Sequence, residues 1–232
     1  WVITVYALVV MLVALALDPR WISQPVAVAA TIVASLLLRA FQIPLTKYSA
    51  LNLLGMVAAG GAVIIGAPGT ALGMYLGVFI ADWWLLRKAP AASAINAGRE
   101  ALALFAAFGF YAWFVALNGG TDVGRMTTEL VPAVALLLAV HFLFSRGLLY
   151  CTLLIRNKLY ADERSLILRY EVIAFGTGTI AVLASLIAIA SVGWAGWVAV
   201  AFVLVFAGLS PRQPFPGRWY KSGVIRKAST IE

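Results

Sequence analysis

The fold of this chain is decided by residues 81–100, which read ADWWLLRKAPAASAINAGRE. The stretch holds the end of one apolar run, a short basic turn and the polar start of the next run. Asp82, Asn96, Arg99 and Glu100 therefore lie in or beside segments that are otherwise apolar enough to cross a bilayer. Charged side chains are costly there, and they persist where they are paired or functional. The stretch predicts two membrane-spanning helices with a polar cluster near their shared turn.

The composition points to the same class. Hydrophobic residues make up 63% of the chain and charged residues 11%, and the mean hydropathy is +0.98. A soluble domain of this size needs more charge to cover its surface, so we expect an integral membrane protein with the lipid bilayer as partner. The net charge of +8 comes without a nucleic-acid-binding motif, so we interpret it as setting membrane orientation and expect no nucleic-acid partner.

Eight segments meet the requirement of about 20 mainly apolar residues for a spanning helix. Short polar or glycine-rich breaks separate them, such as Asp18-Pro19-Arg20 and the turn at Gly66–Gly69. The third and fourth segments are so close that a single re-entrant unit is the alternative for them. The segments cover about 1–17, 22–41, 50–66, 68–87, 93–117, 130–155, 169–191 and 193–209.

Lysine and arginine gather in alternate connections, after the second, fourth and sixth segments, and in the tail. The positive-inside rule places these on the cytoplasmic side, which gives an even number of spans and two cytoplasmic termini. We therefore predict an all-α, polytopic membrane bundle of eight transmembrane helices in a bacterial inner membrane. The membrane domain covers 1–209, and an interfacial tail covers 210–232.

The two ends of the sequence suggest a longer protein. The chain begins at Trp1, and its last residues, VIRKASTIE, are typical of the start of a helix. We expect a soluble cytoplasmic domain after Glu232, with a short disordered tail as the alternative.

At 1.5 Å per residue, polar side chains from several spans fall at a similar depth near the cytoplasmic face. We expect them to neutralise one another inside the bundle. Three interpretations stay open: structural ion pairs that fix helix register, a polar pocket or switch that opens toward the cytoplasm, and snorkelling of Arg99, Arg169 and Glu171 to the headgroups. The candidate ligand-binding or switch residues are Asp82, Asn96, Arg99, Glu100, His141, Arg146 and Glu171.

His141 is the single histidine of the chain and falls near mid-membrane. A hydrogen bond to a neighbouring helix is the favoured role, and a proton relay or a ligand contact is the alternative. His141 and Ser145 are one helical turn apart, as are Asn96 and Glu100, so each pair shares a helix face. No second His or Cys is placed to complete a metal site, and no motif indicates a cofactor or a catalytic residue.

Glycines recur every four residues in the fourth segment, at Gly69, Gly73 and Gly77. Small residues at this spacing let two helix backbones approach closely. We expect this face to pack within the chain, with a homodimer as the alternative.

Residues 66–120 carry a resemblance to a known family. A Gly66/Pro68 turn precedes a helix ending in Asp82 and a basic turn, and an Asn96-Ala97-Gly98 helix then runs to Gly119-Gly120. This pattern resembles the multi-pass membrane region ahead of HD-type phosphohydrolase, GAF or GGDEF (diguanylate cyclase) modules in bacterial signalling proteins, and the similarity extends over about 48–209. One departure is Ser145-Arg146, where the family pattern leads us to expect an Asn.

The resemblance implies a membrane sensor or anchor that couples an unidentified small ligand, or the state of the membrane, to a cytoplasmic output. Any enzymatic activity would then lie after Glu232. A small-solute transporter, or the substrate-binding membrane subunit of one, is the first alternative. A structural subunit of a larger membrane complex is the second.

Overall fold

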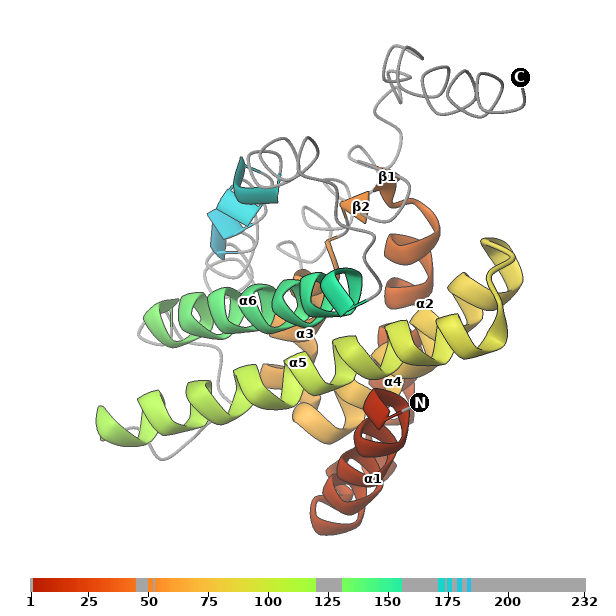
Figure 1. Ribbon diagram of the computed structural model, residues 1–232. Coiled ribbons are helices and arrows are strands. Elements are labelled where there is room, and N and C mark those ends of the chain that lie inside the picture. Colours follow the sequence, from red (N-terminus) through yellow and green to blue (C-terminus); the bar gives the residue numbers. More distant parts are fainter. Residues whose placement is uncertain are drawn as a thin grey trace, which may run out of the picture. The chain divides into compact units, whose positions relative to one another are not determined.

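The computed structural model describes residues 2–44, 50, 51, 53–119 and 131–155, with 171–173, 175, 176, 179, 180, 183 and 184. The chain divides into two units, Trp1–Val200 and Ala201–Glu232, and every described residue belongs to the first. This described part is helical apart from one pair of two-residue strands (Figure 1). The predicted eighth segment and the tail 210–232 lie outside the described residues.

The described elements follow the predicted segments in order. A 3-10 turn, η1, joins the first two helices, and one turn of π-helix, η2, ends the fourth. Strands β1 and β2 pair in antiparallel fashion, with Ile43 opposite Leu51, and the described residues between 171 and 184 are helical. The bounds are α1 Val2–Leu17, η1 Pro19–Ser23, α2 Pro25–Ala40, β1 Ile43–Pro44, β2 Ala50–Leu51, α3 Leu54–Ile65, α4 Ala67–Ile80, η2 Ala81–Leu85, α5 Pro90–Leu117 and α6 Val131–Ile155.

Two helices, α5 and α6, are long and apolar enough to cross a membrane by length and composition. The helices α1 and α2 are apolar but have 16 residues each, and α3 has 12. Twelve residues cover about 18 Å, which is less than a hydrocarbon layer of about 30 Å. Eight full-length spans are therefore not supported by the described helices, although a fold built from apolar helices is.

Prolines explain most of the differences from the predicted bounds. Pro25 and Pro90 stand at the starts of α2 and α5, where a missing N–H and a fixed φ suit the first helical turn. The second segment therefore begins as a 3-10 turn at Pro19 and becomes α-helical only at Pro25, three residues later than expected. The third begins at Leu54, because Ala50 and Leu51 are extended.

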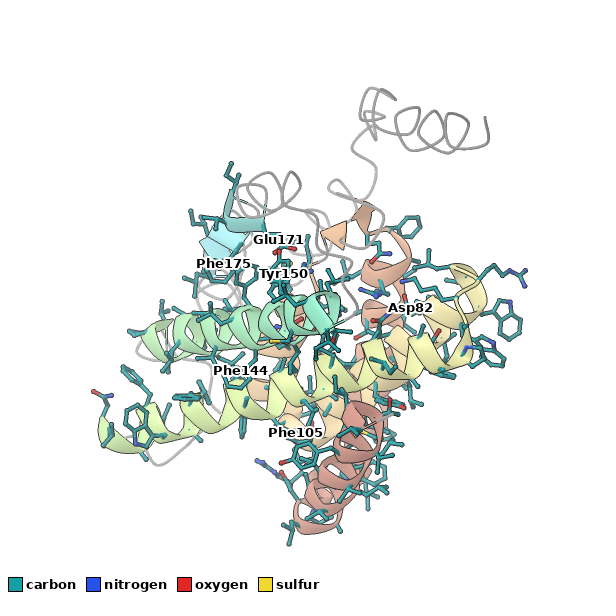
Figure 2. The ribbon with its side chains drawn as sticks, viewed as in Figure 1. Asp82, Phe105, Phe144, Tyr150, Glu171 and Phe175 are labelled. Carbon is teal, nitrogen blue, oxygen red and sulfur yellow. The ribbon has the colours of Figure 1, made fainter. Side chains whose placement is uncertain are left out.

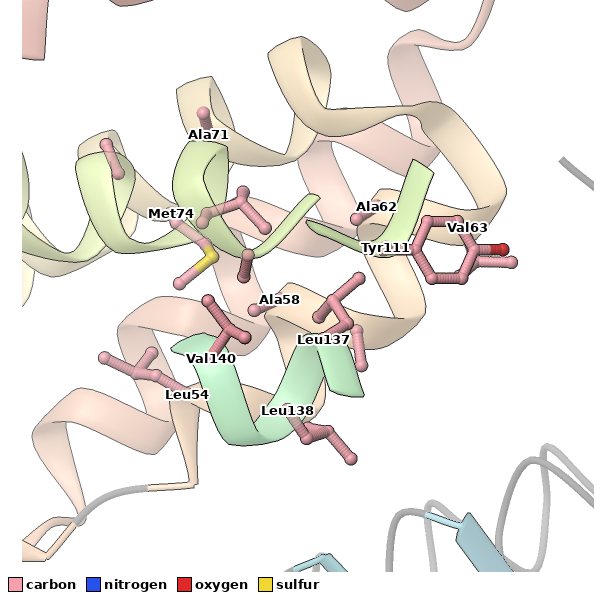
Figure 3. Packing of buried hydrophobic residues seen from close by; sticks show 14 of the residues in the cluster. Leu54, Ala58, Ala62, Val63, Ala71, Met74, Tyr111, Leu137, Leu138 and Val140 are labelled. Carbon is pink, nitrogen blue, oxygen red and sulfur yellow. The ribbon is translucent and has the colours of Figure 1, made fainter. Parts of the chain in front are cut away.

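A cluster of buried apolar side chains joins α3, α4, α5 and α6 (Figure 3). Small residues dominate the α3 side, where Ala58 and Ala62 are buried, and larger ones fill the space opposite. Tyr111 of α5 is the largest of the fully buried side chains in the described part, and Leu137 of α6 is also fully buried. Alanine-lined surfaces let helix axes approach closely, so contact area comes from backbone as well as side chains.

The glycine ladder packs against α2, within the chain, as predicted. A Cβ on Gly77 would lie 2.5 Å from the Ile32 carbonyl oxygen, and one on Gly73 would lie 2.7 Å from Thr31 Cγ2. These two glycines thus touch the body of the partner helix rather than flexible side-chain tips. Gly73 and Gly77 therefore pack closely against α2 within the chain.

The turn between α3 and α4 lies beside the Asp18–Arg20 ion pair at the start of η1. Gly66 has a φ of 85°, which favours glycine, and a Cβ there would lie 3.0 Å from Arg20 Nη2. Asp18 accepts hydrogen bonds from Arg20 Nε at 2.8 Å and Arg20 Nη2 at 2.7 Å. These hydrogen bonds lower the pKa of the Asp18 carboxyl.

Candidate functional site

Asp82 is fully buried at the end of the fourth helix, inside the π-turn η2 (Figure 2). The wider turn directs Asp82 inward and leaves the two tryptophans that follow, Trp83 and Trp84, 48% and 66% exposed. Single π-turns occur often at functional sites. Here the turn separates a buried carboxylate from an outward aromatic pair.

Three side chains donate hydrogen bonds to the Asp82 carboxylate, and we call this group the Asp82 cluster. Arg39 of α2 binds both oxygens, with Nε 2.8 Å from Oδ1 and Nη2 2.9 Å from Oδ2. Lys88 Nζ lies 2.8 Å from Oδ1, and Asn96 Nδ2 of α5 lies 2.6 Å from Oδ2. The carboxylate therefore connects α2, α4 and α5 through charge-assisted bonds, which are about twice as strong as neutral ones.

The basic turn after η2 is shaped to bring Lys88 back to this carboxylate. The Lys88 N–H donates to the Asp82 carbonyl oxygen at 2.9 Å, and Arg87 has a φ of 53°. This bond reaches back one residue further than the corresponding bond of a Schellman ending, and Arg87 adopts the left-handed conformation where glycine is usual. Burial and the charge of Arg39 lower the pKa of the Lys88 ammonium.

Glu100 of α5 is the centre of a second group, the Glu100 cluster. Arg99 Nη2 lies 2.8 Å from Oε1, and Ser145 Oγ of α6 donates to Oε2 at 2.8 Å. His141 Nε2, also on α6, lies 3.7 Å from the same Oε2. Because His141 and Ser145 are one turn apart, both approach one oxygen, as their predicted shared face requires.

The Glu100 cluster is deeply buried and keeps two nitrogen atoms without hydrogen bonds. Arg99, Glu100 and His141 are 5%, 1% and 4% exposed. Within the described part of the chain, Arg99 Nε and His141 Nε2 have no hydrogen-bond partner. Such groups are rare in folded proteins and point to a bound species or a change of state.

A third group, the Glu171 cluster, connects α6 to the helical residues after 170. Tyr150 donates a hydrogen bond to Glu171 Oε2, and Arg146 Nη1 lies 3.4 Å from Oε1. Tyr150 and Glu171 lie close together in Figure 2. Beside them, the rings of Phe142 and Phe175 stack with centroids 4.4 Å apart.

The structure brings the seven predicted site residues into three groups rather than one continuous belt. Neutralisation of each acid by a base is confirmed for Asp82, Glu100 and Glu171. Snorkelling is wrong for Arg99 and Glu171, because both are buried, and Arg169 lies outside the described residues. Asn96 and Glu100 share a face of α5, as predicted, but belong to different clusters.

Sequence reasoning missed Arg39 as a site residue, because its place at the end of an apolar segment also fits a topology signal. It likewise read Lys88 only as part of the basic turn. A better signal was the acid of the fourth segment, Asp82, which needs a cation at the same end of the bundle. The hydroxyl groups of Ser145 and Tyr150 donate hydrogen bonds to Glu100 and Glu171 and add neutral donors to the site.

Chemically, the three clusters hold carboxylates with cations and hydroxyl donors. Among the described residues, no group of three His, Cys, Asp or Glu side chains is placed to hold a metal ion. What the Glu100 cluster does contain is an imidazole beside a carboxylate, a pair that can take up a proton.

The chain matches no protein-family model, and no curated protein or solved structure matches it either. The fold and the site therefore define the class: in the described part of the chain, this is a helical protein with two helices long and apolar enough to cross a membrane and three buried carboxylate clusters between its helices. The resemblance to signalling membrane regions stays a prediction.

Proposed function

We propose that this chain is the membrane-embedded sensor or anchor of a bacterial signalling protein, in which the buried clusters set the packing of the helices. The observation that carries the proposal is the placement of charge. Asp82, Glu100 and Glu171 are each at most 1% exposed and are held by donors from other elements. Buried networks that connect several helices can adopt alternative arrangements, as a transmembrane signal requires.

An apolar outer surface supports the membrane part of this proposal. The side chains of Val5, Val9 and Leu12 on α1 are each more than half exposed. Apolar side chains outside and ion pairs inside suit a lipid solvent better than water.

Exposed tryptophans at the two ends of α5 support it further. Trp84 is exposed just before α5 begins, and Trp113 is 58% exposed near its end. About 35 Å of helix, at 1.5 Å per residue, separates Pro90 from Trp113. Tryptophans favour the two membrane interfaces, which flank a hydrocarbon layer of about 30 Å.

We further propose that eight apolar segments alternate across the inner membrane, with both ends of the chain in the cytoplasm. Lys and Arg in the connections after the second, fourth and sixth segments support this orientation.

The reading frame beyond Glu232, with its neighbouring genes, tests the signalling role first. A phosphohydrolase, GAF or cyclase module in the same frame supports a sensor or anchor. An early stop beside genes for an ATPase and a second membrane subunit supports transport instead and contradicts the proposal.

The second test uses the full-length protein and the activity of its output module. The Asp82→Asn variant leaves Arg39 and Lys88 without their carboxylate, so we expect the output per molecule of protein in the membrane to change. The matched control is Asp18→Asn, which alters an ion pair outside the three clusters. Equal output in all three proteins would contradict a signalling role for the clusters.

A further inference from the structure

The His141 imidazole lies close to the Glu100 carboxylate without a hydrogen bond between them. Its Nε2 atom lies 3.7 Å from Glu100 Oε2, too far for a hydrogen bond, and has no other hydrogen-bond partner in the described part of the chain. Its imidazole is 4% exposed and the Glu100 carboxylate 1%. A buried carboxylate and a buried imidazole nitrogen therefore stand near each other without a bond.

The oxygen that faces His141 has room for one more donor. Ser145 Oγ donates to Glu100 Oε2 at 2.8 Å, and Arg99 binds the other oxygen, Oε1. A carboxylate oxygen accepts two hydrogen bonds. One acceptor position on Oε2 is therefore left for the side of α6 that carries His141.

The other edge of the imidazole faces Gly55 of α3. A Cβ on Gly55 of α3 would lie 3.9 Å from His141 Nδ1 and 3.5 Å from Leu138 Cδ2. The helix α3 carries no charged residue along Leu54–Ile65. The ring thus lies among α3, α5 and α6, with its charged neighbours on the last two.

Burial of the ring is the largest influence on His141 and opposes a positive imidazole, and three charged side chains act on it as well. Glu100 of α5 favours a positive imidazole, while Arg99 of α5 and Arg146 of its own helix oppose one. Glu100 in turn interacts with Arg39 of the Asp82 cluster. Proton uptake at His141 therefore depends on how the carboxylate is shared among its cations.

We propose that His141 and Glu100 form a buried proton-binding site, and that the ligand of this membrane domain is the proton. The imidazole takes one proton from water and becomes an imidazolium, and no other bond breaks. Its Nε2–H then donates to Glu100 Oε2, and the contact shortens to a charge-assisted hydrogen bond of about 2.8 Å. This draws α6 toward α5.

The consequence for signalling rests on the proposed function, but the site itself does not. Glu100 then shares its charge between Arg99 and the imidazolium, and Arg99 is in electrostatic contact with Arg39. Protonation in the Glu100 cluster is therefore felt in the Asp82 cluster, which connects α2, α4 and α5.

Because the chain contains one histidine, the imidazole signals in an NMR spectrum all come from His141 and test the proposal directly. The 232-residue chain, labelled with 15N-histidine and placed in lipid nanodiscs, is titrated from about pH 8 to about pH 5, the range in which imidazoles change charge. We expect one transition from neutral imidazole to imidazolium. An imidazole that stays neutral over this range, while the fold is retained, overturns the proposal.

Variants identify the partner of the proton. Glu100→Gln should lower the midpoint of the transition by about one pH unit or more, a tenfold loss of proton affinity. Arg146→Gln, which removes an opposing cation, should raise it, and Asp18→Asn should leave it unchanged. An unchanged midpoint in Glu100→Gln overturns the proposal, and if that variant does not fold, an unchanged midpoint in Arg146→Gln does so. The titration reads neither topology nor output, so its failure leaves the proposed function standing.

Discussion

Asp82 and Arg39 form the pair whose removal has the largest expected effect on the described helices. Their bidentate contact is almost free of solvent, with side chains 0% and 6% exposed. Breaking a buried pair by removing one partner typically costs about 3–5 kcal/mol, because the other charge stays buried. We expect Asp82→Leu and Arg39→Leu each to lose stability in this range, measured as the free energy of unfolding in mixed micelles.

The double variant decides between pairing and packing at this site. With both charges replaced by leucine, neither Arg39 nor Asp82 is left as a buried charge without the other, and the partly exposed Lys88 loses its carboxylate as it does in Asp82→Leu. The loss should therefore be smaller than the sum of the two single losses. Additive losses would show that the two side chains act independently, contrary to their hydrogen bonds in the structure.

Asp18 gives a pH dependence whose sign follows from its contacts. Its pKa is lowered in the folded chain by the hydrogen bonds from Arg20. A depressed folded-state pKa adds stability above the unfolded value of about 4, and that stability is lost as the pH falls through the folded value. When the pH is lowered below about 4, we expect the thermal unfolding midpoint of wild type to decrease more steeply than that of Asp18→Asn. Parallel curves would contradict a role for this carboxylate.

At the residue scale, the sequence identified the acids of the candidate site but not all of the cations that pair with them. An acid in an apolar run is visible in any hydropathy profile, so Asp82, Glu100 and Glu171 were found. Arg39 was not, because it lies 43 positions from Asp82 and only the parallel packing of α2 on α4 joins them. Long-range pairing of this kind has no local signal.

The contact between α2 and α4 is the element whose geometry allows the sharpest test. A methyl group on Gly77 meets the backbone oxygen of Ile32 at 2.5 Å, so Gly77→Ala must move one helix away from the other. Overpacking of this kind costs about 1–3 kcal/mol. Moving the helices apart also lengthens the contact between Arg39 and Asp82, which lies further along the same interface.

Gly109 of α5 provides the matched control, because a Cβ there meets nothing within 4 Å. Gly109→Ala should stabilise the helix by about 0.5–1 kcal/mol through reduced backbone freedom. Thermal unfolding of the two alanine variants should therefore shift in opposite directions. Shifts of the same sign and size would mean that the ladder makes no close contact.

Element boundaries show where a pattern of apolar residues stops being informative. The Gly-Pro turn before α4 was predicted at the right place because glycine and proline impose their own backbone angles. The π-turn at Ala81–Leu85 was not, since its residues look like a continuing helix and only the burial of Asp82 between α2 and α5 distinguishes them. Tertiary contacts, not propensity, decide that end.

For the molecule as a whole, composition predicted apolar helices correctly but overestimated their length. The predicted segments 22–41 and 50–66 became helices of 16 and 12 residues, α2 and α3, because turns at Pro19 and near Ala50 use residues that a hydropathy window counts as helix. Among the described helices, α5 and α6 are long enough to cross a membrane, and they are also the ones that the Glu100 cluster joins.

Crossing of the membrane by α5 is the prediction on which the proposed topology depends. Ala89 and Asn118 flank this helix and are exposed, and the chain has one natural cysteine, Cys151. In a Cys151→Ser background, we introduce Ala89→Cys or Asn118→Cys and treat spheroplasts with a membrane-impermeant maleimide. The positive charge beside Ala89 places it inside, so Asn118→Cys should react in intact spheroplasts and Ala89→Cys only after permeabilisation. Equal reactivity of both before permeabilisation would mean that α5 does not cross the bilayer, and the buried clusters would then belong to the core of a protein in water.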